Sequence, residues 1–200
     1  MRNRGAEAYK AFVPHFLFMT LPTAIGTCAL VWRGERIVGS FLPEADETRL
    51  VQRVRRRFPD AAEAPPPAAI AATAEAIVRL LEGEAVDLGS APIDLEGTAE
   101  FERQVYDVAL AIPPGQVRTY GEIAQAIGSP GSARAVGVAL GRNPLPIIVP
   151  CHRVLAAGGR SGGFSAPGGV ATKFRMLQIE GAMREEATLF DSLPLAVRPD

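Results

Sequence analysis

The chain has 200 residues, 48% of them hydrophobic and 6% aromatic, so it can form one large or two small folded domains with aliphatic cores. Its two cysteines exclude a disulfide framework and a Cys-rich zinc site, and they fit a reduced, cytoplasmic setting. No apolar run reaches the roughly 18 residues of a membrane span, and Pro14 and His15 interrupt the apolar run near the start. We therefore expect neither a membrane segment nor a signal peptide.

The net charge of −1 does not indicate a nucleic-acid partner, but the distribution of charge along the chain does. Between Glu122 and Glu180 there is no Asp or Glu, although the chain has 22 acidic residues in all. The same window contains six cations, which are Arg134, Arg142, Arg153, Arg160, Lys173 and Arg175. A chance gap in acidic residues is the alternative. We favour a surface that attracts phosphate groups.

The first half of the chain alternates strand and helix patterns, which predicts an α/β domain over residues 20–96 after an N-terminal extension over 1–19. Its expected elements are strands at 26–31 and 37–41 joined by a Gly-containing turn, a helix at 47–58, an Ala/Pro linker at 61–69, a helix at 70–81 and short strands within 86–95. The helix at 47–58 also carries Arg53, Arg55, Arg56 and Arg57. We favour a solvated helix face for this run, with a nucleic-acid patch as the alternative.

From Gly97 onward the pattern becomes mainly helical. The expected elements are helices at 98–112, 119–127 and 129–140, a Gly-rich loop at 158–169, a helix at 170–180 and a polar tail over 183–200. Thr119 and Glu122 have the spacing of a capping box, and Ser129-Pro130 can cap and start the following helix. Two short helices joined by a turn of three or four residues are a helix-turn-helix candidate.

The segment 147–154 carries the chemistry. Its first three residues are β-branched and predict a short buried strand that ends at Pro150, directly before Cys151 and His152. A thiol becomes a good nucleophile only as thiolate, and a nearby base or cation lowers its pKa. Neighbouring strand residues face opposite sides, so the pair favours a relay or a bridging water over direct proton transfer. The alternative is an inert core cysteine, but the three prolines at 144–150 indicate a rigid, specialised segment.

Several motifs together match a known family. They are Arg134-Ala135-Val136-Gly137, Asn143-Pro144 and Pro150-Cys151-His152-Arg153-Val154, with Tyr120 upstream and Glu180-Gly181 downstream. In these motifs the chain resembles the O6-alkylguanine-DNA alkyltransferases, also called methylated-DNA–protein-cysteine methyltransferases. The resemblance is strong over residues 98–181 and holds in outline over 23–95. It implies a ribonuclease-H-like α/β domain at 20–96, followed at 97–182 by a mainly helical, winged-helix-like DNA-binding and catalytic domain with a helix-turn-helix.

The resemblance also implies roles for individual residues in catalysis. Cys151 is the expected alkyl acceptor, and His152 is the expected base that deprotonates it through a water molecule. Glu180 is expected to orient His152, as the third group does in a catalytic triad. Asn143 is expected to brace the turn before the active-site segment, and Tyr120 to donate to guanine N3 as the base leaves.

A second set of residues is implied in binding DNA and the damaged base. Arg134 is expected to enter the base stack when the nucleotide is flipped out. The Val154 carbonyl and the backbone near Ser165 are expected to contact guanine, and Phe164 is expected to stack on it. The remaining residues of this set are Ala135 and Gly137, whose small side chains would let a helix approach a groove closely, together with Arg153 and Lys173.

The activity implied by the resemblance is irreversible, single-turnover transfer of a methyl or other alkyl group from O6-alkylguanine in DNA to Cys151, with O4-alkylthymine as a further candidate substrate. No cofactor, metal or membrane partner is expected. The expected partner is double-stranded DNA, which the protein would approach from the minor groove as a monomer. Phe164 stands where the family often has Tyr, and the loop at 165–169 is longer than the family's short form, which leaves the substrate range open.

Two other classes of function remain open at this point. One is a cysteine hydrolase or transferase that turns over repeatedly on an acyl substrate. The other is a DNA-binding relative that senses lesions, although such relatives lack the acceptor cysteine and Cys151 is present. The intact mass after mixing with methylated DNA separates these two classes from the alkyltransferase hypothesis. Only single-turnover alkyl transfer predicts one methyl group gained per protein molecule.

Overall fold

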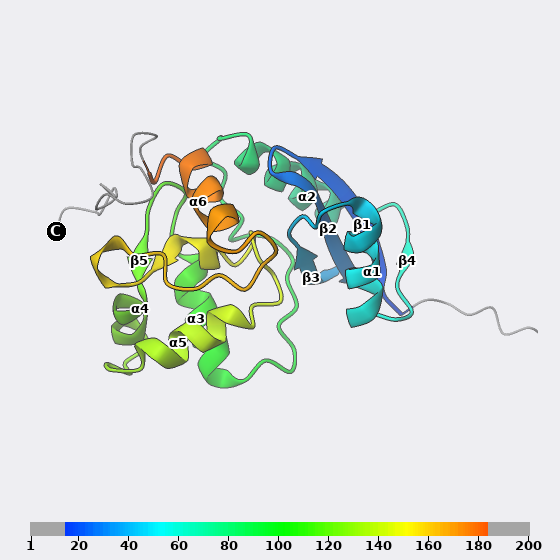
Figure 1. Cartoon of the computed structure of the whole chain (residues 1–200). Coiled ribbons are helices and arrows are strands. Elements are labelled where there is room, and N and C mark those ends of the chain that lie inside the picture. Colours follow the sequence, from blue (N-terminus) through cyan, green and yellow to red (C-terminus); the bar gives the residue numbers. More distant parts are fainter. Residues whose placement is uncertain (1–14, 184–200) are drawn as a thin grey trace, which may run out of the picture.

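The computed structural model describes residues 15–183, so most of the expected N-terminal extension and nearly all of the expected tail lie outside the described residues. The described chain forms two regions that lie side by side (Figure 1). The first contains a four-stranded sheet and two α-helices, and the second contains four further α-helices with short or irregular segments between them.

The sheet has the strand order β3-β2-β1-β4, in which β1, β2 and β3 pair antiparallel and β4 pairs parallel to β1. Its strands are β1 (Leu17–Thr23), β2 (Gly26–Arg33), β3 (Arg36–Phe41) and β4 (Ala62–Glu63). The predicted hairpin is confirmed as β2 and β3. The expectation of an extension up to residue 19 is wrong for its last residues, because Phe18 pairs with Val31 and is fully buried in the sheet.

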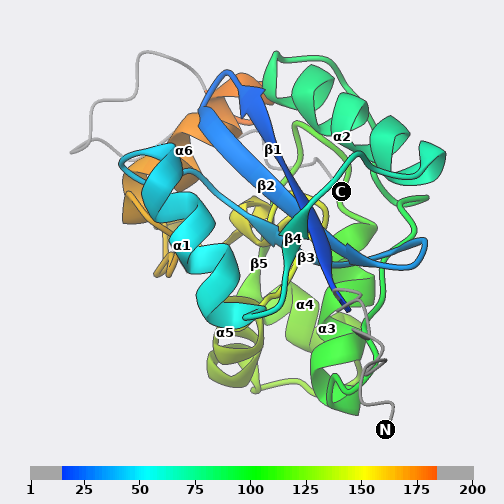
Figure 2. The same cartoon turned by 90° about the vertical axis from the view of Figure 1, so that its right-hand side faces the viewer.

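Two helices cover opposite faces of this sheet, α1 (Glu47–Arg57) and α2 (Ala68–Leu81) (Figure 2). Alternate residues of β2 separate between the two faces, as the two-residue period of a strand requires. Ala29 and Val31 pack with Leu50 of α1, whereas Leu30 and Trp32 belong to the core cluster that includes α2. Both helices confirm the predicted positions.

The second region is built from α3 (Glu100–Leu110), α4 (Tyr120–Ala126), α5 (Ala133–Gly141) and α6 (Gly169–Ile179). The predicted capping box at the start of α4 is confirmed, since Thr119 and Glu122 exchange hydrogen bonds with each other's backbone. The prediction that the next helix starts at Ser129-Pro130 is wrong, because α5 begins at Ala133. Gly131 lies between them with a φ of 90°, which a right-handed helix cannot contain.

The predicted strand at 147–149 does not form. Ile147 has a φ of 77°, and the segment has only an isolated bridge between Pro146 and Val149. The expected burial is nevertheless found, with at most 2% of Ile147, Ile148 and Val149 exposed. The apolar, β-branched residues thus predicted the burial of this segment correctly, but they did not predict its backbone conformation. Likewise, the short strands expected within 86–95 reduce to one bridge between Ile37 and Ile93.

Short elements that the sequence did not reveal surround Cys151. The residues Cys151–Arg153 form a 3₁₀ turn (η1), and β6 (Val154–Leu155) follows it and pairs parallel with β5 (Arg118–Thr119). A second turn, η2 (Ala157–Gly159), forms the start of the Gly-rich loop. These contacts connect the entrance of α4 to the segment that carries the thiol.

The two regions share one hydrophobic cluster. It extends from Trp32 in the sheet and Ile77 in α2 to Val105 in α3, Val136 in α5 and Val149 beside the thiol. Ser40 of β3 also donates to the Pro146 carbonyl at 2.6 Å and binds the Pro144 carbonyl through its backbone N–H at 3.1 Å. The sheet therefore holds the segment that precedes Cys151. No helix among residues 15–183 is long and apolar enough to cross a membrane.

Candidate active site

Cys151 lies at the start of η1 and contributes to the wall of a cavity of about 730 Å³. Only 8% of the residue is exposed, so the thiol is reached through this cavity. The cavity is lined by residues from α1, α4, α5, η1, the segment between α5 and η1, and the Gly-rich loop. These are Arg53, Arg57, Tyr120, Ala133, Arg134, Gly137, Val138, Leu140, Gly141, Arg142, Asn143, Pro146, Cys151, Gly163, Phe164, Ser165 and Ala166.

Behind the thiol, His152 and Glu180 form a buried pair with 2.9 Å between His152 Nε2 and Glu180 Oε1. Arg153 holds the same carboxylate with two hydrogen bonds of 2.8 Å, from Nε to Oε2 and from its terminal nitrogen to Oε1. The other ring nitrogen of His152, Nδ1, has no hydrogen-bond partner among residues 15–183. That nitrogen is therefore available to accept a proton while Glu180 holds the opposite side of the ring.

The protonation states follow from burial and these contacts. Burial raises the pKa of the Cys151 thiol, although the Asn143 side chain and the positive charge of Lys173 oppose the shift. Burial also lowers the pKa of His152, more strongly than Glu180 raises it. For Glu180, burial alone would raise the pKa, but the hydrogen bonds and charges of His152 and Arg153 lower it to about 2. The resting site thus combines a thiol, a neutral imidazole and a carboxylate.

Asn143 fixes the segment that leads to the thiol. Its Nδ2 donates to the Val149 carbonyl at 2.8 Å, and its Oδ1 accepts from the Leu145 backbone N–H at 2.9 Å. An amide nitrogen carries two hydrogens, so one donor remains for the sulfur of Cys151. This arrangement agrees with the bracing role that we expected for Asn143, and it explains how Ile147 is held at its unusual backbone angle.

Lys173 is completely buried beside the cavity rather than placed on the surface. Its ammonium group donates to the carbonyls of Val154 at 2.6 Å and Ser161 at 2.8 Å. It also lies 5.8 Å from the ring centre of Tyr120 and 6.0 Å from that of Phe164. Burial lowers the pKa of Lys173 to about 8, with Cys151 opposing the shift. The group therefore supplies a positive charge near the sulfur at neutral pH.

The structure brings most of the predicted site residues together, but not all. Cys151, Asn143, Tyr120, Arg134, Gly137, Phe164 and Ser165 line the cavity. Ala135 instead lines a neighbouring hollow beside α3, together with Arg134. Arg153 is buried in the ion pair with Glu180, and the Val154 carbonyl is occupied by Lys173. Arg153 and Val154 thus bind other residues of the protein behind the cavity and do not line it.

Three contributors were not expected from the sequence. Arg53 and Arg57 of α1 reach the cavity, although the arginine run had been interpreted as a solvated helix face. Gly162, with a φ of 64°, leaves room for Tyr120, because a Cβ there would lie 2.7 Å from its ring. The arginine run was visible in the sequence, whereas nothing local indicated the approach of Tyr120. Among residues 15–183 no group of three or more His, Cys, Asp and Glu side chains is placed to hold a metal ion.

Comparison with known proteins identifies this arrangement. The family model of the DNA-binding domain of 6-O-methylguanine DNA methyltransferase matches residues 100–182. The methylated-DNA–protein-cysteine methyltransferase of Mycobacterium bovis is 42% identical over 128 residues, which cover 64% of this chain and 75% of that protein. The protein of the same name from Methanothermobacter thermautotrophicus is 42% identical over 120 residues, which cover 60% and 66%.

Solved structures give the same result. The crystal structure of Mycobacterium tuberculosis OGT in complex with DNA has a TM-score of 0.64 and 32% identity, and the match covers 82% of this chain and 92% of that one. The O6-methylguanine-DNA methyltransferase from Pyrococcus kodakaraensis has a TM-score of 0.64 and 29% identity, covering 83% and 99%. The chain belongs to the methylated-DNA–protein-cysteine methyltransferase family.

Proposed function

We propose that this protein repairs DNA by direct reversal of damage. It transfers a methyl or other alkyl group from O6-alkylguanine irreversibly to its own Cys151, once per molecule. The observation that carries this proposal is the thiol at the wall of a cavity with the His152–Glu180 pair buried behind it. The names of its relatives, which are methylated-DNA–protein-cysteine methyltransferases, describe the same chemistry.

The reaction forms a bond between the Cys151 sulfur and the alkyl carbon while the bond from that carbon to guanine O6 breaks. The proton of the thiol passes to His152 Nδ1 through a bridging water. The leaving guanine takes up a proton at N3 from the Tyr120 hydroxyl, and the imidazolium later returns the thiol's proton to Tyr120 through water, so that protein and base both end neutral. Because burial keeps the thiol and the imidazole neutral at rest, the proton moves as the substrate is attacked. The Glu180 carboxylate then stabilises the imidazolium, and no cofactor takes part.

DNA is the partner of this reaction. The alkylated base must leave the duplex to reach a cavity, and α5 carries the residues for this step. Arg134 takes the place of the flipped nucleotide in the stack, while Ala135 and Gly137 let α5 approach the minor groove closely. In the cavity, Phe164 stacks on guanine and the backbone near Ser165 contacts its edge, whereas the Val154 carbonyl is bound by Lys173. Lys173 and Arg153 hold these contacts in place from behind.

The architecture that we propose follows the family. Residues 20–96 form a ribonuclease-H-like α/β domain, supported by the antiparallel β3-β2-β1 strands with β4 parallel to β1. Residues 97–182 form a winged-helix-like domain in which α4 and α5 are the helix-turn-helix, supported by the packing of these two short helices. The protein acts as a monomer in the cytoplasm, where its two free cysteines stay reduced.

Intact-mass measurement tests the function. Mixing the protein with duplex DNA containing O6-methylguanine should add one methyl group per molecule, and peptide mapping should place it on Cys151. Cys151→Ser should gain none yet still fold and bind DNA, because a hydroxyl is nearly isosteric but does not ionise near neutral pH. Cys28 serves as an internal control, since burial raises its pKa to about 12 despite the hydrogen bond between its thiol and the Thr23 hydroxyl. Repeated turnover of an acyl substrate, or a methyl group on Cys28, would contradict the proposal.

A further inference from the structure

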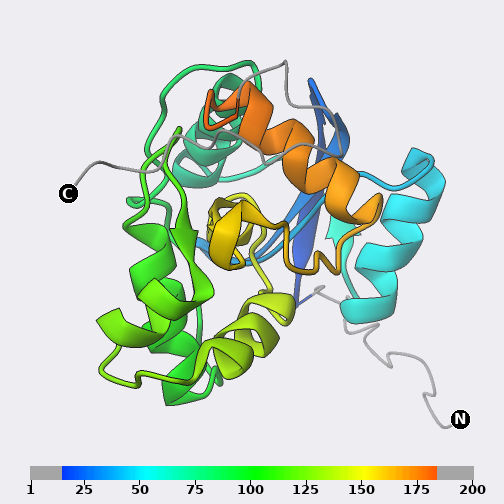
Figure 3. The same ribbon diagram turned by 60° about the vertical axis from the view of Figure 1, so that its left-hand side comes forward.

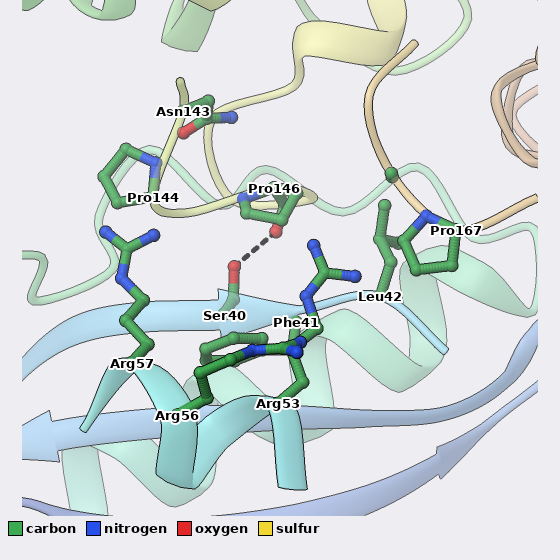
Figure 4. A pocket seen from close by; sticks show the side chains of 11 residues that line it. Ser40, Phe41, Leu42, Arg53, Arg56, Arg57, Asn143, Pro144, Pro146 and Pro167 are labelled. Atoms are coloured by element: carbon green, nitrogen blue, oxygen red, sulfur yellow. Dashed lines mark hydrogen bonds between the residues drawn. The ribbon is translucent and has the colours of Figure 1, made fainter. Parts of the chain in front are cut away.

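Helix α1 sends arginine side chains from the first region to the active-site cavity. Arg53 and Arg57 line the cavity that contains Cys151, and together with Arg56 they line a second cavity of about 210 Å³ next to it. Figure 4 shows Arg53 and Arg57 extending from α1 toward the segment with Asn143, Pro144 and Pro146. We call Arg53, Arg56 and Arg57 the arginine wall.

The arginine wall is neutralised only in part. No Asp or Glu lines either cavity. Arg53 pairs with Glu44 at 2.6 Å, but Arg56 and Arg57 are exposed and take part in none of the ion pairs among residues 15–183. Arg134 and Arg142 line the same larger cavity from the other region, and Arg142 pairs with Glu102 at 3.3 Å. Several cations that face one cavity repel one another, so the site favours an anionic occupant.

Helix stability alone does not account for the position of the wall. Cations in the last turn of a helix interact favourably with its dipole, and Arg55, Arg56 and Arg57 all lie in the last turn of α1. Arg55 satisfies this requirement equally well but lines neither cavity. Arg55 and Arg57 therefore lie in the same helical turn, but only the side chain of Arg57 lines the cavities. Arg55 is for this reason a matched control for Arg57.

We propose that the arginine wall, and Arg57 in particular, binds a backbone phosphate of the DNA strand that carries the damaged nucleotide. This proposal rests on the proposed function. Figure 3 shows α1 and α5 on either side of the loop that precedes α6, and residues of all three line the cavity of Cys151. A nucleotide that enters this cavity brings the phosphates of its own strand with it. The planar guanidinium group matches a phosphate with two parallel hydrogen bonds.

The consequence is that the first region contributes directly to DNA binding. Arg134 on α5 contacts the base pairs that stay stacked. The arginine wall binds the backbone of the damaged strand at the point where the flipped nucleotide leaves the stack. Arg53 is held in position by Glu44 at 2.6 Å and by the Phe41 ring, whose centre is 6.0 Å from its guanidinium carbon. Arg57 lies on the neighbouring helical turn, with its guanidinium carbon 5.7 Å from the centre of the Phe58 ring and without a carboxylate partner among residues 15–183. Its N–H donors are therefore available to bind the phosphate.

The salt dependence of DNA binding tests the proposal. We would measure the affinity of the parent, Arg57→Ala, Arg57→Lys and Arg55→Ala for a duplex with one O6-methylguanine over a range of salt concentrations. Each phosphate contact contributes roughly 0.7 to 0.9 to the slope of log K against log salt. Arg57→Ala should lose about that amount, Arg57→Lys should retain the slope, and Arg55→Ala should match the parent. Equal slopes for Arg57→Ala and Arg55→Ala would overturn the proposal.

A second arm identifies the phosphate. Single phosphates near the lesion are replaced in turn by uncharged methylphosphonate, on the damaged strand and on its complement. At one position of the damaged strand, the parent should bind as weakly as Arg57→Ala, and the variant should lose nothing further. An Arg57→Ala effect that persists at every damaged-strand position would overturn the proposal. If the parent gains a methyl group from the duplex without methylphosphonates but Arg57→Ala binds DNA like the parent, the arginine-wall proposal is wrong and the proposed function stands. A parent that gains no methyl group overturns both it and the proposed function.

Discussion

At the scale of single residues, the two cysteines show how the surroundings of a thiol determine its reactivity. Cys28 lies inside the sheet with 1% exposed, and its neighbour Thr23 only partly offsets the rise in pKa caused by burial. Cys151 is nearly as buried, yet it lines a cavity, and Asn143 and the Lys173 ammonium stabilise its thiolate. Burial alone therefore does not make a cysteine inert. The polar groups placed around the sulfur determine whether it can react.

Glu180 is the residue whose removal should affect both rate and stability. We expect Glu180→Gln to slow alkyl transfer by on the order of tenfold or more, because the imidazolium loses its compensating charge. The same change leaves Arg153 buried without a carboxylate, which costs about 3–5 kcal/mol of unfolding free energy. Single-turnover rates on saturating DNA and denaturant titrations measure the two effects.

The exposed pair of Arg79 and Glu84 provides a control for this substitution. Glu84→Gln also removes one partner of an ion pair, but its side chain is 50% exposed and that of Arg79 is 58% exposed. Because water and salt screen an exposed ion pair, we expect a much smaller loss of stability than for Glu180→Gln and no change in rate. Equal rates for Glu180→Gln and the parent would show that Glu180 does not serve His152.

At the scale of elements, α5 makes a prediction about base flipping. Arg134 is exposed on this helix and, with Val138 one turn later, lines the cavity of Cys151. Arg134→Ala should slow the repair of duplex DNA by about tenfold beyond its loss of affinity, because unstacking a base costs a few kcal/mol. Single-stranded DNA should be affected less, and Arg134→Lys should rescue poorly, because an ammonium group is not planar.

Single-turnover rates on duplex and single-stranded substrates at saturating protein measure this effect. Val138→Ala on the same face of α5 is a suitable control, since it removes side-chain volume without removing charge. Should Arg134→Ala slow both substrates equally, or should Arg134→Lys restore the duplex rate fully, the role of Arg134 in the stack would be wrong.

Elements with a strong local signal were predictable from the sequence, and those fixed by distant contacts were not. The apolar stripe of α1 and the capping box at Thr119 act within a few residues, so both were found. The path of residues 143–150 depends on Ser40, which lies more than 100 positions earlier, and on side-chain bonds from Asn143. Their apolar pattern is shared by strands and by buried loops, so burial was predicted and the backbone was not.

The same distinction holds for the site. The motif around Cys151 and the position of Glu180 could be read from the sequence through the family resemblance, and the structure brings His152 and Glu180 into contact. The direction of Arg57 could not be read in this way, because a run of arginines has the same composition on a solvated face and beside a cavity. Only the packing of α1 against the sheet separates the two cases.

At the scale of the whole molecule, the buried titratable groups predict a decrease in stability toward acid. The folded pKa of His152 lies below its ordinary value of 6.5 and that of Glu180 is about 2 against 4.5. Both folded pKa values are depressed, so both contributions are fully present above the ordinary pKa and are lost as the pH falls. The free energy of unfolding should decrease as the pH falls below 6.5, and decrease again between 4.5 and about 2.

Denaturant titrations at a series of pH values from 8 down to about 3 test this expectation. His152→Gln should flatten the dependence between about pH 6.5 and 5 and leave the steeper decrease below it. A free energy of unfolding that stays constant from pH 7 to 5 in the parent would contradict the buried, neutral state of His152.

The hydrophobic cluster shared by the two regions has a consequence for the capacity of a cell to repair its DNA. Since Trp32 in the sheet and Val149 beside the thiol belong to one cluster, damage to the packing anywhere in it lowers the folded fraction of the entire molecule. An enzyme that turns over can compensate for a smaller folded population by working longer. A protein that is consumed in its only reaction cannot, so its supply of repair events equals its number of folded copies. Warming or a mild core substitution far from Cys151 thus subtracts directly from the number of lesions that can be removed.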